Sequence, residues 1–248
     1  MDRSINWKQY MATQRLNFAE WTPDQPTVAG TLLDVNNAVP LLTGYGLFPQ
    51  AVDYSNNAGE DLNNVYAGKF SNITELFAGG ASKLFKYNSG TQNLTDVSQA
   101  GGYSGERWEF VQYGDALLAT NNAEKIQVWY VNSSTAFADV AATAPVAKYV
   151  TVIRDFVVAA NLSGEPNKVQ WSDLNDETNW TAGAASQSDF QIISDGGNIR
   201  GITGGEFGII LLERAIVRMS YIGSPYFFQR SEEHTSELQS HHDLVCRL

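Results

Sequence analysis

The chain has 248 residues, of which 16 are Lys or Arg and 27 are Asp or Glu, so its formal net charge is −11. Its three His and single Cys all lie between His234 and Cys246. The rest of the chain therefore lacks the side chains for a His-based triad, a thiol nucleophile, a disulfide or an imidazole metal site. The acidic balance also disfavours sequence-independent binding of nucleic acid, which depends on Lys and Arg.

Residues 1–64 differ in pattern from the rest of the chain. Four prolines are interspersed with aromatic residues here, which predicts an extended N-terminal arm rather than regular structure. We expect Trp21, Tyr45 and Phe48 to pack onto the main domain or onto a neighbouring subunit. The start has no signal-peptide pattern, and no run of about 18 apolar residues occurs anywhere, so no membrane partner is expected.

Residues 65–229 repeat one unit of short strands and tight turns. The second unit, for example, reads RWEFVQYGD, ALLATNN, KIQVWYVN and FADV. A lysine opens the third strand at Lys83, Lys125 and Lys168, at separations of 42 and 43 residues. Four strands in roughly 40 to 50 residues is the period of a propeller blade. We therefore predict an all-β fold, a β-propeller of four-stranded blades, with about four blades in this region.

Hydrophobicity within the units agrees with this fold. The apolar run Phe156–Ala160 indicates a buried strand, whereas the alternation in Lys125–Trp129 indicates a half-exposed one. A β-sandwich with irregular hairpins is the alternative. Because each blade must bury both faces, four blades predict a propeller that is incomplete at the C-terminus and a native protein that continues.

Residues 230–248, RSEEHTSELQSHHDLVCRL, contain the only grouping of His, Cys and acidic residues. The lone Cys follows a His-His doublet, which is not the paired-ligand spacing of a structural zinc site. Read back into codons, the whole stretch resembles a sequencing-library adapter. We therefore predict a non-native tail and no metal, and we exclude the tail from the functional interpretation.

The alternation Asp173, Asn175 and Glu177 resembles the start of a calcium loop. The pattern fails afterwards, since Thr178 stands where the loop needs Gly and Ala184 where it needs Glu. The sequence favours a hairpin loop with Asx-type hydrogen bonds.

Trp171 and Trp180 bracket this loop. Packing between blades is favoured over sugar binding, because sugar binding needs exposed rings. No pair of carboxylates lies in a motif for glycoside hydrolysis, and the glycine pairs lack the Lys-Ser/Thr of a phosphate loop. No catalytic, metal-binding or cofactor-binding residue is predicted, and no cofactor is expected.

Several stretches together resemble one protein family. They are FAEWTPDQP, NNAVPLLTGYGLFPQ, VQWSDLNDETNW and IRGITGGEFGIILLERAIVRMSYIG, within residues 15–229. They are similar to the packaged-DNA stabilisation, or tail hub, proteins of tailed bacteriophages.

This resemblance implies a non-enzymatic virion component assembled in the host cytoplasm. It would form a homo-oligomeric ring that contacts a portal or adaptor and the distal tail proteins. Packaged DNA would pass its channel without sequence-specific binding. The alternative is a carbohydrate-binding or glycan-cleaving propeller of a phage adhesion apparatus.

Overall fold

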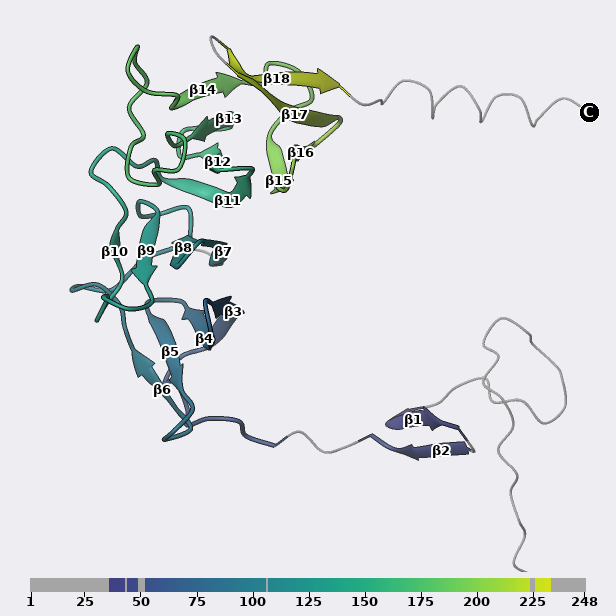
Figure 1. Cartoon of the computed structure of the whole chain (residues 1–248). Helices are drawn as coiled ribbons and strands as arrows, with labels where there is room; N and C mark the ends of the chain where they lie inside the picture. The colour runs from purple at the N-terminus through teal and green to yellow at the C-terminus, as the bar shows by residue number, and fades with distance from the viewer. Residues whose placement is uncertain (1–35, 43, 49–51, 106, 224–225, 233–248) are drawn as a thin grey trace, which may run out of the picture. The chain divides into compact units, whose positions relative to one another are not determined.

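The computed structural model describes residues 36–42, 44–48, 52–105, 107–223 and 226–232 (Figure 1). All regular elements in these ranges are β-strands. Accordingly, the part of the chain that is described contains no helix long and apolar enough to cross a membrane. The chain divides into two compact units, Met1–Asp53 and Tyr54–Leu248.

The first unit contains a hairpin of β1 (Ala38–Leu41) and β2 (Gly44–Leu47). The prediction of an arm without regular structure is therefore wrong for these residues. Pro40 is tolerated in β1, opposite Tyr45, because a two-stranded hairpin leaves one side of each strand without a hydrogen-bonding neighbour. Trp21 lies outside the described residues.

The second unit contains four antiparallel sheets of four strands, each built from consecutive strands. Blade 1 consists of β3 (Leu62–Phe70), β4 (Ile73–Gly80), β5 (Leu84–Asn88) and β6 (Asn93–Asp96). Blade 2 consists of β7 (Glu109–Tyr113), β8 (Ala116–Thr120), β9 (Gln127–Tyr130) and β10 (Ala138–Asp139). Blade 3 consists of β11 (Ala147–Ile153), β12 (Phe156–Leu162), β13 (Glu165–Trp171) and β14 (Asp189–Ile192). Blade 4 consists of β15 (Ile199–Thr203), β16 (Gly208–Leu212), β17 (Ile216–Gly223) and β18 (Phe227–Glu232).

This succession of meanders confirms the predicted all-β fold with four-stranded propeller blades. We call the face of a blade that points to the next blade in chain order its forward face, and the opposite one its backward face. Since side chains alternate along a strand, each middle strand supplies residues to both faces.

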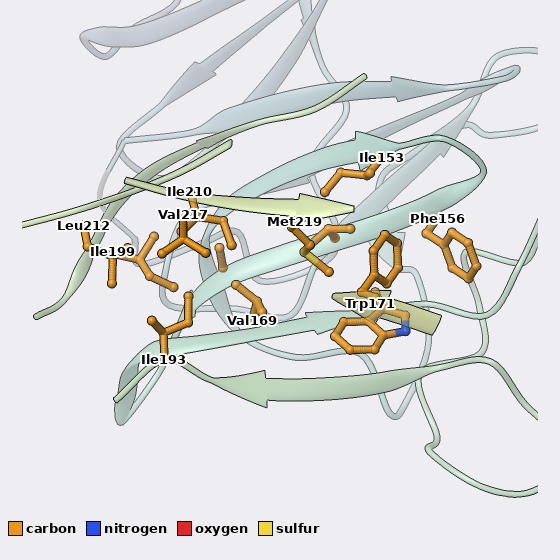
Figure 2. Packing of buried hydrophobic residues seen from close by; sticks show 13 residues of the cluster. Ile153, Phe156, Val169, Trp171, Ile193, Ile199, Ile210, Leu212, Val217 and Met219 are labelled. Carbon is orange, nitrogen blue, oxygen red and sulfur yellow. The ribbon is translucent and has the colours of Figure 1, made fainter. Parts of the chain in front are cut away.

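Three apolar clusters join the blades face to face. Phe77 and Leu84 of blade 1 meet Leu117 and Trp129 of blade 2. Leu118, Ile126 and Val128 of blade 2 meet Val150, Val157 and Ala159 of blade 3. Figure 2 shows the third cluster, in which Val169 and Trp171 of blade 3 meet Ile210, Val217 and Met219 of blade 4. The alternative of a two-sheet sandwich does not hold, because consecutive sheets pack in series.

The first strands of the four blades, β3, β7, β11 and β15, contact one another in order. They therefore form the inner side of the array, as the innermost strands of propeller blades do.

Regular structure extends past both ends of the predicted repeat region, residues 65–229. At the N-terminal end, β3 begins at Leu62, and the segment before it belongs to the second unit, where the rings of Tyr54 and Tyr87 stack at 5.0 Å. At the other end β18 continues through Glu232, three residues into the predicted non-native tail. Backbone ladders accept most side chains, so pairing such as that of Met219 with Arg230 does not require a native sequence. Residues 233–248 lie outside the described residues.

Candidate functional site

The turns between the first and second strands share an unusual backbone conformation. The first turn residue has a positive φ in three blades: 51° at Ser71, 58° at Gly114 and 53° at Arg154. Glycine adopts this region without steric cost, whereas Ser and Arg rarely do. Such conformations persist where neighbouring structure holds them in place.

Each of these turns contacts the following blade. Ser71 Oγ donates to Asp115 Oδ1 at 3.0 Å, and the Tyr113 hydroxyl donates to the backbone carbonyl of Asp155 at 2.8 Å. Arg154 Nη2 lies 3.3 Å from Glu206 Oε1, and the Arg154 backbone N–H donates to the Gly205 carbonyl at 2.8 Å. We call this line of turns, comprising Ser71, Asp115, Arg154, Asp155 and Glu206, the turn rim.

A cavity of about 530 Å³ opens on the turn rim between blades 2 and 3. Its polar lining includes Tyr113, Asp115, Tyr130, Arg154, Asp155 and Glu177. Carboxylates outnumber the single guanidinium among these residues. Arg154 is further engaged over the ring of Tyr221, 5.3 Å from its centroid. The cavity therefore presents mainly hydrogen-bond acceptors and phenol groups.

Both tyrosines of the cavity are held in the protonated form. Burial raises the pKa of Tyr113 to about 12, and the nearby carboxylates of Glu177 and Asp155 act in the same direction. Burial, together with the hydrogen bond that the Tyr130 hydroxyl donates to Glu177 Oε1 at 2.7 Å, also raises the pKa of Tyr130. Neither phenol is therefore a base near neutral pH.

The loop after β13 has the Asx-type hydrogen bonds that the sequence favoured over a calcium site. Asp173 Oδ1 accepts backbone N–H groups of Leu174 and Gln187, each at 2.8 Å, and Asp176 Oδ1 accepts that of Thr178 at 2.9 Å. Burial alone would raise the pKa of Asp173, but these hydrogen bonds outweigh it and lower the pKa. Among the described residues no group of three or more His, Cys, Asp or Glu is placed to hold a metal ion.

Trp171 and Trp180 are almost fully buried and belong to different inter-blade clusters. Trp171 packs between blades 3 and 4 and Trp180 between blades 2 and 3. Trp171 Nε1 donates to the Gln187 carbonyl and Trp180 Nε1 to the Glu177 carbonyl, both at 2.7 Å. These rings are thus packing residues and are not exposed for stacking on a sugar.

Tyr45 and Phe48 lie in the first unit. Tyr45 is half-buried within β2, and the Phe48 backbone N–H donates to the Asn37 carbonyl at 2.9 Å and extends the hairpin. The Phe48 side chain is exposed. Its packing on a domain or a subunit stays a prediction.

The sequence interpretation missed the turn rim, although a signal was present. The first strand of the second unit ends in YGD and that of the third in IRD, so Asp115 and Asp155 hold equivalent places in the repeat. An acidic residue that recurs at a turn is a surface feature unrelated to burial, and only the fold brings Glu177 beside it.

Comparisons with known proteins give no close relative. No family model and no curated protein match the chain. Among solved structures, PorZ, a surface component of the type-IX secretion system of Porphyromonas gingivalis, matches with a TM-score of 0.45 and 13% identity over 72% of this chain and 22% of that one. A BBS1N complex with ARL6DN matches with a TM-score of 0.44 and 10% identity over 73% and 59%. BamB from Moraxella catarrhalis matches with a TM-score of 0.39 and 10% identity over 63% and 45%. The chain spans less than two thirds of the length of each.

Proposed function

We propose that this chain is a non-enzymatic structural component of a tailed-phage virion, of the head-to-tail connector or tail hub type. Its role is to help retain packaged DNA and to attach the tail through contacts between protein subunits. The observation that carries the proposal is that the large aromatic side chains in the resembling stretches pack between blades and do not face a ligand. Trp171 and Trp180, the two tryptophans of VQWSDLNDETNW, bind blades to one another, and their ring N–H groups are satisfied by backbone carbonyls.

The acidic charge of the turn rim supports a channel through which DNA passes without being bound. Asp115, Asp155, Glu177 and Glu206 line or adjoin the rim, and Arg154 is engaged by Glu206 and by an aromatic ring. Because phosphate binding depends on Lys and Arg, an acidic surface does not retain a DNA duplex that passes it.

Fluorescence anisotropy with a labelled DNA duplex tests this role. At about 50 mM salt we expect the protein to form no complex tighter than about 1 μM, the tight end of nonspecific binding. The double variant Asp115→Lys/Asp155→Lys is the matched control, and we expect it to gain salt-sensitive affinity. Tight, salt-sensitive binding by the unchanged protein would contradict the DNA-path part of the proposal.

A glycan-binding or glycan-cleaving function is the second candidate. The cavity on the turn rim favours it, since Tyr113 and Tyr130 stand there beside the carboxylates of Asp155 and Glu177. Release of reducing ends from a capsular polysaccharide, abolished by Glu177→Gln and retained in Ile192→Glu, would establish this function. No release from a panel of such polysaccharides would dismiss the glycan-cleaving form.

A further inference from the structure

The linker between blades 3 and 4 places an exposed aspartate directly before a glycine. Residues 194–198 of this linker, between β14 and β15, read SDGGN. Asp195 is exposed, and the two glycines after it, Gly196 and Gly197, have positive φ values of 92° and 85°. Asp195 is the only aspartate in the whole sequence that a glycine follows.

An Asp-Gly pair can rearrange without an enzyme. The backbone nitrogen of the glycine attacks the side-chain Cγ of the aspartate, and a succinimide ring forms with loss of a water molecule made from the carboxyl OH and the amide proton. Water then opens the ring at either carbonyl. Opening at the side-chain carbonyl restores aspartate, whereas opening at the main-chain carbonyl breaks the original peptide bond and leaves isoaspartate. A side chain on the second residue crowds the ring closure, and glycine has none.

The reacting groups at this site have few competing contacts. Between residues that the structure describes, no hydrogen bond uses the Gly196 N–H. The Asp195 carboxylate accepts one long hydrogen bond, from the Ser194 hydroxyl at 3.5 Å. By contrast, Asp173 accepts two backbone N–H groups at 2.8 Å. The Asp195 carboxylate can therefore turn toward the glycine nitrogen at a lower cost than that of Asp173.

The fold requires the glycine of this pair. A Cβ at Gly196 would lie 2.8 Å from the Cβ of Ala215, and the positive φ disfavours any L side chain. The Gly196 carbonyl accepts the Arg214 N–H at 3.0 Å, and the Asn198 carbonyl accepts the Glu213 N–H at 3.2 Å. These contacts attach the linker to the turn between β16 and β17. The close approach that needs glycine thus retains the reactive pair at an exposed position.

We propose that Asp195 is a site of spontaneous isomerisation to isoaspartate, through a succinimide with Gly196, and that the conversion loosens the linker from the turn between β16 and β17. The main chain of the product runs through Cβ and Cγ, so it is longer by one carbon atom and carries its carboxylate on Cα. Since Gly196 packs against Ala215, the added length displaces the carbonyl that holds Arg214. The inference rests on the linker alone and holds for either proposed function.

Ageing of the purified protein at neutral pH tests the modification. Samples taken over time are digested and treated with protein isoaspartyl methyltransferase, which methylates isoaspartate from S-adenosylmethionine, and mass spectrometry locates the methyl group. We expect the methylated fraction to rise with time at Asp195, with a succinimide form that is lighter by one water molecule. Asp195→Glu should lose this label, because its cyclisation needs a larger and slower-forming ring. The matched control Asp155→Glu, at an exposed aspartate that precedes Phe156, should retain it.

The modification is overturned if aged protein contains no isoaspartate at Asp195. It is equally overturned if the label is spread evenly over the other aspartates, or if it persists in Asp195→Glu.

Hydrogen exchange of fresh and aged protein tests the consequence for the fold. We expect the amides of Arg214 and Glu213 to exchange faster after ageing, because they lose their acceptors in the linker. The amide of Arg154, which donates to the Gly205 carbonyl elsewhere between blades 3 and 4, should keep its rate. Aged Asp195→Glu should exchange like fresh protein. Equal rates in fresh and isoaspartate-containing protein would overturn the proposed loosening.

Discussion

Replacing Trp171 by Ala tests whether the blades are held together by their aromatic clusters. The ring is almost fully buried between blades 3 and 4, lies 5.0 Å from Phe228 in an edge-on arrangement, and donates its N–H to the Gln187 carbonyl. Truncation of such a ring leaves a cavity and costs about 3 to 5 kcal/mol. The lost aromatic pair accounts for about 0.5 to 1.5 kcal/mol of this loss.

Urea unfolding followed by far-ultraviolet circular dichroism measures the change in the free energy of unfolding. The matched control is Phe190→Ala on β14, an aromatic truncation in the same blade at a residue that is 45% exposed. That control removes one exposed contact with Lys168 and is expected to cost no more than about 1 kcal/mol. If Trp171→Ala lost less than about 1 kcal/mol, or no more than the control, the packing argument would be refuted.

Three further predictions concern other parts of the second unit. Gly79→Ala places a Cβ 2.3 Å from the buried Trp108 ring, so we expect a loss of about 1 to 3 kcal/mol in the same urea assay. Folding favours the protonated phenols of Tyr113 and Tyr130, so their contribution to the free energy of unfolding is complete below pH 10 and is lost as the pH rises toward 12. Tyr130→Phe should make the unfolding free energy decline less steeply over this alkaline range. Because the pKa of Asp173 is lowered, its contribution to the free energy of unfolding is complete above the ordinary carboxyl pKa and is lost as the pH falls below it. Asp173→Asn should therefore cost about 1 to 3 kcal/mol of unfolding free energy at pH 7 and make that free energy less dependent on acid pH.

The order of the strands could be predicted from the sequence because the buried strands of each blade appear as apolar runs. Phe156–Ala160 is the fully buried part of β12. Trp171 and Trp180 lie between blades, as the packing interpretation predicted. Lys83 and Lys125, which marked the repeat, pair with Asp96 and Asp139 on the fourth strands of their blades. Lys168 instead pairs with Glu165 in its own strand.

Other features depend on information that side-chain patterns do not carry. The positive φ of Arg154 accompanies a hydrogen bond from its backbone N–H to the Gly205 carbonyl of blade 4, and arginine itself gives no sign of this conformation. The hairpin around Pro40 was missed because proline argues against a strand wherever the strand has neighbours on both sides. The exposed forward face of blade 4 has the same composition as a buried one, so only the packing distinguishes them.

Electron microscopy of the purified protein in negative stain, with a mass measurement on the same sample, tests the central claim most directly. We expect closed rings of several copies around one axis, as a connector requires. Open filaments would contradict the connector role. A strictly monomeric protein that cleaves polysaccharide would also contradict it and would favour the second candidate function.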